Sequence, residues 1–249
     1  MKDLKNKRIV VTGGNSGIGL ATARRCAEEG ASVAIVGRRQ AALDEAVASI
    51  GHGARAYPCD VTSVQSLSQL FKQIEADMGG LEGLVISAGG TGAGPLPTCT
   101  EEAFDDLISL NIKSVFFTTQ KALPLLANPS AIVIIGSIAS EIVVPGGSVY
   151  AATKVALKQF ARCWAEDLGP RGIRVSVLAP GYTETPLLER LSSTSEGQKM
   201  FDHMVNDRTS LKRRGRADEV GAVAAFLCSD DASYMTGGTI FVGGGGENW

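Results

Sequence analysis

Short apolar segments alternate with longer amphipathic segments along most of the chain. Seven of the short segments are rich in β-branched residues and apolar at nearly every position, which is typical of strands buried on both faces of a parallel sheet. We expect these strands at residues 8–11, 32–36, 54–57, 83–86, 131–135, 174–178 and 239–242. Helices are expected between them, so the pattern predicts an α/β fold, a doubly wound parallel sheet of about seven strands with helices on both faces.

No linker, internal repeat or low-complexity segment divides the 249 residues, so we expect one domain that covers residues 1–249. Lys and Arg number 24 against 26 Asp and Glu, which leaves a net charge of -2. Because the chain has no block of like charges, we do not expect it to bind nucleic acid or another polyanion.

Apolar runs such as 131–135 and 142–144 are too short to cross a bilayer, and residues 1–8 lack the apolar segment of a signal peptide. We therefore expect a cytoplasmic protein with no membrane partner. The 5 cysteines are odd in number and scattered, with no Cys-x-x-Cys spacing, and there are 2 histidines. These features argue against disulfides and against a metal site.

The first expected strand runs into a glycine-rich stretch, residues 12–19, and a helix is expected at 20–29. Glycines in such a turn let the backbone approach a pyrophosphate, which binds the free N–H groups at the helix start. An ordinary glycine-rich turn is the alternative interpretation. The position after the first strand of a βαβ unit favours a dinucleotide cofactor.

The second expected strand ends at Gly37 and is followed by Arg38 and Arg39, where an NAD-binding fold would place a carboxylate. Arginines at a helix start oppose the helix dipole, which is easier to understand if they bind a 2′-phosphate. We therefore expect NADP(H) to be favoured over NAD(H), with a solvated arginine pair as the alternative. Asp60 could accept from an adenine amino group, or it could organise the turn before Thr62, the expected cap of the next helix.

Later strands also end in residues that suit a binding site. Residues 87–89 are small and would let a cofactor ribose lie against the end of the fourth strand. After the sixth strand, Thr185 is the expected cap of a helix that starts at Pro186, although its hydroxyl could also bind a nicotinamide carboxamide. Residues 243–246 are all glycine, and we expect them to form a flexible exit.

Tyr150 and Lys154 share one face of a helix expected at 149–168, because they are four residues apart. A neighbouring cation lowers the pKa of a tyrosine and makes it a better acid/base, although such a pair is more often a packed ring and a solvated amine. Ser137 follows the fifth strand and could hold a substrate oxygen. Asn111 lies in a mostly apolar helical stretch, where an amide is either a satisfied core group or part of a site.

Over essentially its whole length the chain resembles the short-chain dehydrogenase/reductase family. The glycine stretch matches the pattern Thr-Gly-x-x-x-Gly-Ile-Gly of its cofactor loop, and Pro180-Gly181 with Thr185 matches the segment that closes over nicotinamide. Four residues match its catalytic set in order and spacing: Asn111, Ser137, Tyr150 and Lys154. The resemblance implies a Rossmann-like fold and NAD(P)-dependent interconversion of a carbonyl and an alcohol.

The resemblance also implies roles for these residues. Tyr150 would be the acid/base, and Ser137 would hold the substrate oxygen. Lys154 would lower the pKa of Tyr150 and bind the nicotinamide ribose, and Asn111 would support a proton relay. The implied cofactor site comprises Gly13, Asn15, Ser16, Gly17, Ile18, Gly19, Arg38, Arg39, Asp60, Val61, Ser87, Ala88, Gly89, Tyr150, Lys154, Pro180, Gly181, Thr183 and Thr185.

Two departures from the family pattern stand out. Residues 87–89 are Ser-Ala-Gly where the family commonly has Asn-Ala-Gly, which bears on side-chain bridging beside the cofactor. Residues 243–245 are Gly-Gly-Gly where the family commonly has Asp-Gly-Gly, which bears on packing at the C-terminal edge. The family also implies a homo-oligomer, either a tetramer or a dimer.

By the same resemblance, segments 90–98, 138–147 and 182–204 would build the substrate pocket, with a lid at about 186–212. Its apolar side chains would be Ile142, Val143, Val144, Leu187, Leu188 and Leu191. Such a wall predicts a medium-sized hydrophobic ketone or secondary alcohol, unless these side chains only pack the lid.

Two further functions stay open. A 3-oxoacyl-carrier reductase is the second enzyme candidate, although the turn 127–130 lacks the basic residues expected of a carrier-docking patch. A dinucleotide-sensing protein without turnover is the candidate of another class, but a sensor would need no proton donor.

Overall fold

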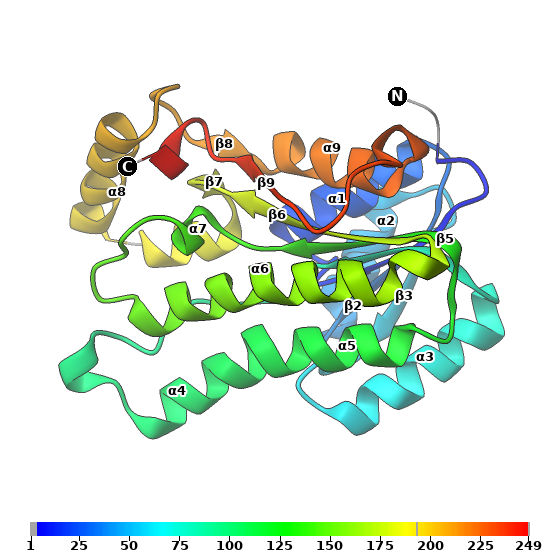
Figure 1. Ribbon diagram of the computed structural model, residues 1–249. Coiled ribbons are helices and arrows are strands. Elements are labelled where there is room, and N and C mark those ends of the chain that lie inside the picture. The colour runs from blue at the N-terminus through cyan, green and yellow to red at the C-terminus, as the bar shows by residue number, and fades with distance from the viewer. Residues whose placement is uncertain (1–3, 193, 249) are drawn as a thin grey trace.

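The computed structural model describes residues 4–192 and 194–248. Residues 1–3, 193 and 249 fall within the expected domain, and 193 within the expected lid, but they lie outside the described residues. Seven parallel strands form the main sheet in the order β3-β2-β1-β4-β5-β6-β9 (Figure 1). They are β1 (Arg8–Thr12), β2 (Ser32–Gly37), β3 (Arg55–Pro58), β4 (Leu81–Ile86), β5 (Leu126–Ile135), β6 (Ile173–Pro180) and β9 (Thr239–Val242).

Helices cover both faces of this sheet. Helices α1, α2 and α9 pack on one face, and α3, α5 and α6 pack on the other (Figure 1). The helices are α1 (Gly17–Glu28), α2 (Gln40–Ile50), α3 (Val64–Met78), α4 (Glu101–Ile108), α5 (Ser114–Ala122), α6 (Ser148–Leu168), α7 (Pro186–Leu191), α8 (Ser195–Arg208) and α9 (Ala217–Cys228). The doubly wound α/β fold and its seven strands, each overlapping its expected range, are therefore confirmed.

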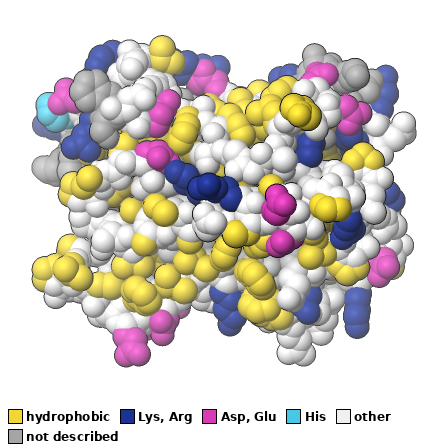
Figure 2. Space-filling model, in the orientation of Figure 1, with side chains coloured by type: hydrophobic (Ala, Val, Ile, Leu, Met, Phe, Trp, Pro, Cys, Tyr) yellow, Lys and Arg dark blue, Asp and Glu magenta, His cyan; other side chains and the backbone are white. Residues whose placement is uncertain are grey.

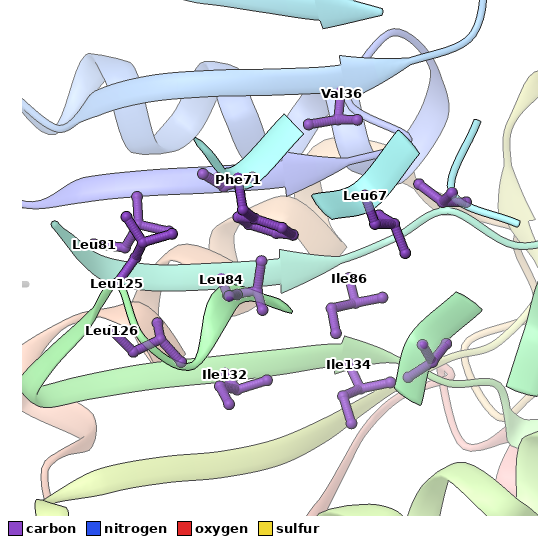
Figure 3. Packing of buried hydrophobic residues seen from close by; sticks show 14 of the residues in the cluster. Val36, Leu67, Phe71, Leu81, Leu84, Ile86, Leu125, Leu126, Ile132 and Ile134 are labelled. Carbon is purple, nitrogen blue, oxygen red and sulfur yellow. The ribbon is translucent and has the colours of Figure 1, made fainter. Parts of the chain in front are cut away.

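Alternate residues of the central strands serve opposite sides of the core. Val10 of β1 packs beneath α3, α5 and α6, whereas Ile9 and Val11 pack beneath α1, α2 and α9. Figure 3 shows the first of these two cores, in which Leu67 and Phe71 of α3 lie over the strands. Burial on both faces explains why the strands are apolar at nearly every position, and each buried aliphatic side chain contributes roughly 1.5–3 kcal/mol.

The order of the strands places a site at one edge of the sheet. The chain moves outward from β1 through β2 to β3 and then returns to β4 on the other side of β1. Ligands of doubly wound folds bind at such a reversal, outside the carboxyl ends of the strands. The loops after β1 and β4 flank this point.

A second, two-stranded sheet pairs β7 (Thr183–Glu184) with β8 (Gly215–Arg216). The sequence did not predict it, because strands of two residues are too short to produce an alternating pattern. Between these strands lie α7 and α8, in the stretch where the sequence pattern is weakest. Thr194 caps α8, since its hydroxyl accepts the N–H of Gly197 at 3.0 Å.

Two of the expected helix caps can be compared with the structure. The expectation that Thr62 caps α3 is wrong, because the cap is Ser63, whose hydroxyl accepts the N–H three residues on at 3.2 Å. Thr185 does cap α7, and the next residue is its first helical position, as expected. Within the described residues, no helix has both the length and the apolar character needed to span a membrane.

Candidate active site

The site residues gather at the carboxyl edge of the sheet. The glycine loop follows β1, residues 87–89 follow β4, Ser137 follows β5, and Gly181 follows β6. Tyr150 and Lys154 lie in the first two turns of α6, which packs against β6. Segments far apart in the sequence therefore meet where the strand order predicts a ligand.

Tyr150 and Ser137 are joined through their side chains by a hydrogen bond. The Ser137 oxygen also accepts the N–H of Ala139 at 3.1 Å, which fixes the serine at the start of a short 3-10 turn. Lys154 Nζ lies 5.6 Å from the centroid of the Tyr150 ring and donates to the carbonyl of Ile135 at 3.3 Å. A phenol, a hydroxyl and an ammonium group thus converge at the end of β5.

Burial shifts the pKa of both ionisable groups. Lys154 is only 7% exposed, and the loss of water lowers its pKa to about 8. Burial raises the pKa of Tyr150, and the hydrogen bond with Ser137 opposes this shift only in part. The expected lowering of the Tyr150 pKa is therefore wrong for this arrangement, because burial disfavours the phenolate more than its neighbours stabilise it. Tyr150 keeps its proton at neutral pH, which is the form that a proton donor needs.

Asn111 lies in a π-helical turn (Ser109–Lys113) between α4 and α5, a type of turn that is frequent at functional sites. Its side chain is buried and bonded at both ends. Oδ1 accepts the N–H of Gly90 at 2.9 Å, while Nδ2 donates to the carbonyl of Gly90 at 2.9 Å and to Thr153 Oγ1 at 3.1 Å. These bonds explain how an amide is accommodated there, and they connect it to α6. The proton relay stays a prediction.

The glycines of the loop after β1 lie too close to neighbouring backbone for a side chain to fit. A Cβ on Gly13 would lie 2.9 Å from the backbone nitrogen of Ala88, and the φ of Gly13 is +65°. A Cβ on Gly19 would overlap the carbonyl of Gly13, whose carbon would be 2.8 Å away. Thr12 Oγ1 accepts the N–H groups of Ser87 and Ala88 at 3.1 and 3.2 Å, which fastens the loop to the end of β4. The glycines of the loop therefore expose their backbone, and close packing holds this backbone in one position.

This loop leads into an uncapped start of α1. The N-cap residue Ser16 makes no side-chain capping bond, and the first turn from Gly17 contains no acidic residue. Free N–H groups and the positive end of a helix suit a pyrophosphate. A Cβ on Gly17 would lie 3.3 Å from Thr185 Cγ2, so the loop also borders the segment after β6. Asn15 Oδ1 lies against Gly37, at the end of β2. The residues present fit the phosphates of a dinucleotide.

The arginines lie where an adenosine 2′-phosphate is expected. Arg39 is the N-cap residue of α2, and both Arg38 and Arg39 are exposed. Arg38 and Asp60 line a cavity of about 490 Å³. Asp60 Oδ1 accepts the N–H and the hydroxyl of Thr62 at 3.0 and 2.8 Å. These bonds, and the Arg38 cation, lower the pKa of Asp60. Asp60 therefore organises the turn after β3, which was one of its two expected roles.

Several of the predicted cofactor residues have a structural role of their own. Val61 is buried in the core beneath α3, and Ile18 packs against the opposite core. Thr183 is buried and its hydroxyl donates to the carbonyl of Gly181 at 3.1 Å. Thr185 uses its hydroxyl to cap α7, accepting an N–H at 3.3 Å. The contribution of these residues to a ligand site stays a prediction.

The predicted substrate wall is only partly exposed. Val143 is 80% exposed and Leu187 is 36% exposed, whereas Ile142 is buried. Val144 and Leu188 are both half-buried, so only part of the expected wall faces solvent. The side chain of Leu191 lies outside what the structure describes. The loop that carries Val143 and helix α7 thus each present an apolar side chain to solvent.

The C-terminal glycines are packed, so the expected flexible exit is wrong. A Cβ on Gly243 would lie 2.9 Å from Ile138 Cγ2 and would overlap Glu247 Oε2. The N–H of Leu211 donates to the carbonyl of Gly244 at 3.1 Å. Gly181 packs on this segment as well, since its missing Cβ would be 2.6 Å from the Cα of Gly243. The glycines let the C-terminal turn lie against Ile138, just after β5, and against Leu211.

Sequence reasoning missed two residues that contact this region. Thr153 is completely buried beside Tyr150, and its place between the two expected catalytic residues was the only signal for it. Glu247 reaches Gly243 by folding back over a turn, for which the sequence has no local signal. In the part of the chain that the structure describes, no group of three or more His, Cys, Asp or Glu side chains could hold a metal ion.

Comparison with known proteins agrees with this architecture. A family model described as enoyl-(acyl carrier protein) reductase matches residues 13–247. The chain is 41% identical to oxidoreductase asL5 of Sarocladium schorii, over 97% of this chain and 96% of that protein. It is 35% identical to gluconate 5-dehydrogenase of Gluconobacter oxydans, over 97% and 95% of the two chains.

Solved structures give the same result. A short-chain dehydrogenase/reductase of Serratia marcescens superposes with a TM-score of 0.91 and 30% identity, over 98% of this chain and 99% of that one. A putative short-chain alcohol dehydrogenase of Sinorhizobium meliloti superposes with a TM-score of 0.91 and 33% identity, over 98% and 97%. The match of family model, relatives and fold over almost the whole length shows that this chain is an oxidoreductase and belongs to the short-chain dehydrogenase/reductase family.

Proposed function

We propose that the protein interconverts a ketone or aldehyde and an alcohol with NADP(H), and that Tyr150 is the general acid/base. The observation that carries the proposal is the hydrogen bond between the Tyr150 and Ser137 side chains, with Lys154 Nζ 5.6 Å from the tyrosine ring. Two hydroxyl groups that face one another can both bind one substrate oxygen. A protonated phenol in that position can then donate its proton to the oxygen.

Each residue has a distinct role in this reaction. NADP(H), when bound, supplies the hydride in reduction and accepts it in oxidation. In reduction, Ser137 donates a hydrogen bond to the substrate carbonyl oxygen, and Tyr150 transfers its proton to the same atom. In oxidation, the proton returns from the alcohol to Tyr150. Lys154, held by the carbonyl of Ile135, stabilises the phenolate that forms and binds the nicotinamide ribose.

The preference for NADP(H) rests on the charge at the end of β2. Arg38 is exposed there and lines the cavity of about 490 Å³ with Asp60. A guanidinium group binds a phosphate through two parallel hydrogen bonds, which gives it strength and direction. We expect Arg38→Ala to weaken NADPH binding by about 10-fold or more and to leave NADH binding nearly unchanged. Equal affinity of the unmodified protein for NADH and NADPH would contradict this preference.

The proposed substrate is a medium-sized hydrophobic ketone or secondary alcohol. The loops that carry residues 90–98 and 138–147 lie side by side, since a Cβ on Gly146 would be 3.8 Å from Pro95 Cβ. Leu96 on the first loop and Val143 on the second are both exposed. Leu187 of α7 adds a third exposed apolar side chain. Exposed apolar groups beside a site that holds a few polar groups favour an apolar substrate.

A carrier-bound 3-oxoacyl group is the second candidate substrate. The description of the matching family model names an acyl carrier protein too, but with an enoyl group in place of a 3-oxoacyl group. Residues 127–130, which were expected to form a turn, lie at the start of β5, and they include no basic residue that could dock an acidic carrier. We therefore expect a free 3-oxoacyl thioester to be reduced no more slowly than the same group on a carrier protein. A large preference for the carrier-bound form would reverse the order of the two candidates.

We also propose that the protein is a cytoplasmic homo-oligomer, a tetramer or a dimer. Phe104 of α4, Phe116 of α5 and Val155 of α6 are large apolar side chains that are exposed. Figure 2 shows apolar side chains gathered along this helical face. A second copy of the same chain would cover such a face symmetrically. All five cysteines are free, which suits a reducing compartment. Light scattering tests the assembly, and cell fractionation tests the location.

The decisive experiment is a matrix of NADH and NADPH against ketones, aldehydes and alcohols, read by nicotinamide absorbance. We expect Tyr150→Phe to lower kcat by about 10²–10⁴-fold, because it removes the proton donor and keeps the ring. Tyr234→Phe is the matched control, since Tyr234 is fully exposed and should not affect turnover. Binding of NADPH with no turnover of any compound, and no effect of Tyr150→Phe, would favour a dinucleotide-sensing protein instead.

A further inference from the structure

Thr153 is a completely buried threonine on the catalytic helix, one residue before Lys154. Its hydroxyl donates to the backbone carbonyl of Tyr150 at 2.7 Å and accepts from Nδ2 of Asn111 at 3.1 Å. A hydroxyl has a single hydrogen to donate, so Thr153 uses it on the backbone that carries the catalytic tyrosine. The bond from Asn111 comes from a different segment, the π-helical turn between α4 and α5.

The network continues from Asn111 to the loop after β4. Asn111 holds both polar groups of the Gly90 backbone at 2.9 Å, accepting its N–H and donating to its carbonyl. Gly89 lies next to these groups, because a Cβ there would be 3.4 Å from Asn111 Oδ1 and 3.7 Å from Lys154 Nζ. The Gly89–Gly90 backbone is therefore fixed to Tyr150 through Asn111 and Thr153, and it lies beside the lysine.

Other buried threonines on helices bond differently. Thr119 of α5 is buried, and its hydroxyl donates to the carbonyl of Val115, one turn back in its own helix, at 2.9 Å. Thr22 of α1 makes the same kind of bond to the carbonyl of Ile18 at 2.8 Å. Among the described residues, neither of these hydroxyls bonds to another segment. The bond between Thr153 and Asn111 is thus more than the usual way of satisfying a buried hydroxyl.

We propose that Thr153 is a positioning residue, which sets the place of Tyr150 relative to the Gly89–Gly90 backbone. It has no contact with the reacting atoms and acts through Asn111 and the backbone of Tyr150. The proposal rests on the function proposed above, in which Tyr150 transfers the proton. Without the Thr153 hydroxyl, Asn111 has a buried N–H with no acceptor, so its amide turns or moves and releases Gly90. A displacement of about 1 Å in such a site can lower turnover by about 10²-fold.

The test is Thr153→Val, which keeps the shape of the side chain and removes its hydrogen bonds. We expect kcat to fall by about 10–10²-fold, with a much smaller change in KM and in NADPH affinity, because the substrate-binding groups remain. The pH profile of kcat should also shift, since the position of the proton donor changes. Thr153→Ser keeps the hydroxyl and should recover kcat to within about 3-fold of the original protein.

Thr119→Val is the matched control. It removes a buried hydroxyl with a similar bond to its own helix, so it should lower thermal stability to a similar degree as Thr153→Val. Its kcat and pH profile should stay unchanged, because Thr119 makes no bond to the site within the described residues. Equal loss of kcat in the two valine variants would overturn the proposal, and so would an unchanged kcat in Thr153→Val.

A second measurement does not depend on turnover. Hydrogen exchange of the peptide that contains Gly90 should become faster in Thr153→Val and stay the same in Thr119→Val. If the unmodified protein reduces no carbonyl but Gly90 responds in this way, the proposed function fails while the coupling stands. If turnover is present and neither kcat nor Gly90 exchange responds to Thr153→Val, the coupling fails and the function stands. Should Thr153→Val not fold, Thr153→Ala is measured by the same two readouts.

Discussion

Two glycine-rich segments border the site. Both pack closely, but the close packing has a different consequence in each. The first, residues 13–19 after β1, packs against itself and against the end of β4, and it leaves the start of α1 uncapped. The second, residues 243–246 after β9, packs against Ile138 and Gly181 and is covered by the side chain of Glu247. The first segment exposes backbone to a ligand, whereas the second makes room for the protein's own side chain.

The difference shows that a cluster of glycines does not by itself indicate a ligand site. What separates the two segments is the element that follows each one. After residue 16 a helix of 12 residues begins, and its positive end attracts an anion. After the second segment there is only a short turn, Gly246–Asn248. Its glutamate places a carboxylate oxygen beside Gly243, the position at which the family commonly has an aspartate.

The largest effect is expected at the first segment. Gly19→Ala would push a methyl group into the carbonyl of Gly13, which is rigid backbone and cannot move aside easily. We expect a loss of about 1–3 kcal/mol of unfolding free energy and, because the loop shifts, a loss of cofactor binding of about 10²-fold or more. Gly169→Ala is the control, since nothing lies within 4 Å of its missing Cβ. Urea unfolding and fluorescence titration with NADPH measure the two effects, and equal behaviour of both variants would contradict the comparison.

The burial of Lys154 can be tested through the pH dependence of the free energy of unfolding. Burial lowers its pKa from 10.5 to about 8, so between these values the unfolded chain holds a proton that the folded protein has released. The free energy of unfolding therefore rises with pH across this window. Lys154 raises it by about 3 kcal/mol in total, and this rise is complete once the pH exceeds the pKa of the lysine in the unfolded chain.

The measurement is urea unfolding from about pH 7 to about pH 11 for the unmodified protein and for Lys154→Met, a window that spans both values of the lysine pKa. Other groups titrate over the same range in both proteins, so the difference between the two curves isolates the lysine. We expect this difference to change in favour of the unmodified protein as the pH rises. Parallel curves would mean that Lys154 is hydrated in the folded state.

The sequence predicted the parts of the structure that depend on local patterns. The seven strands follow from their apolar runs, and the glycine loop follows from its place between a strand and a helix. That Ser137, Tyr150 and Lys154 lie together was also anticipated, because they match the catalytic set of the short-chain dehydrogenase/reductase family in order and spacing. The local patterns were sufficient for the strands and the glycine loop, whereas this grouping came from the family resemblance.

The sequence could not predict contacts that depend on folding. The bond between Asn111 and Thr153 joins residues from different helices, and neither residue type signals it. Glu247 reaches Gly243 only after the C-terminal turn has formed. The raised pKa of Tyr150 reflects its burial, which spacing in a helix does not report, so the direction expected from that spacing was wrong.

A smaller effect is expected when the second segment is changed to the common family residue. Gly243→Asp should cost about 1–3 kcal/mol, because its side chain would enter space that Glu247 occupies. Glu247 Oε2 is buried and has no hydrogen-bond partner in the described residues. Combining Gly243→Asp with Glu247→Ala should therefore recover most of the loss, as one carboxylate replaces the other.

Urea unfolding of the two single variants and the double variant forms a double-mutant cycle for this exchange. Gly238→Asp with Glu247→Ala is the control pair, since nothing lies within 4 Å of the missing Cβ of Gly238. We expect strong coupling at Gly243 and none at Gly238. Additive losses at Gly243 would show that the glutamate does not fill the position of the aspartate.

The smallest effect is expected beside residues 186–212, the segment predicted to be a lid, whose last residues contact the second glycine segment. Arg214 pairs with Asp202 of α8 at 2.7 Å, with side chains 21% and 63% exposed. Exposed ion pairs contribute about 0–1 kcal/mol and weaken with salt, so Asp202→Asn should cost less than about 1 kcal/mol and nothing measurable at about 1 M salt. The packing of Gly245 against Ser210 and the bond from Leu211 to Gly244 do not depend on charge. Urea unfolding compares the two variants. If Asp202→Asn destabilises the protein more than Gly243→Asp does, the ion pair stabilises this region more than the close packing of the second glycine segment, which would contradict the comparison.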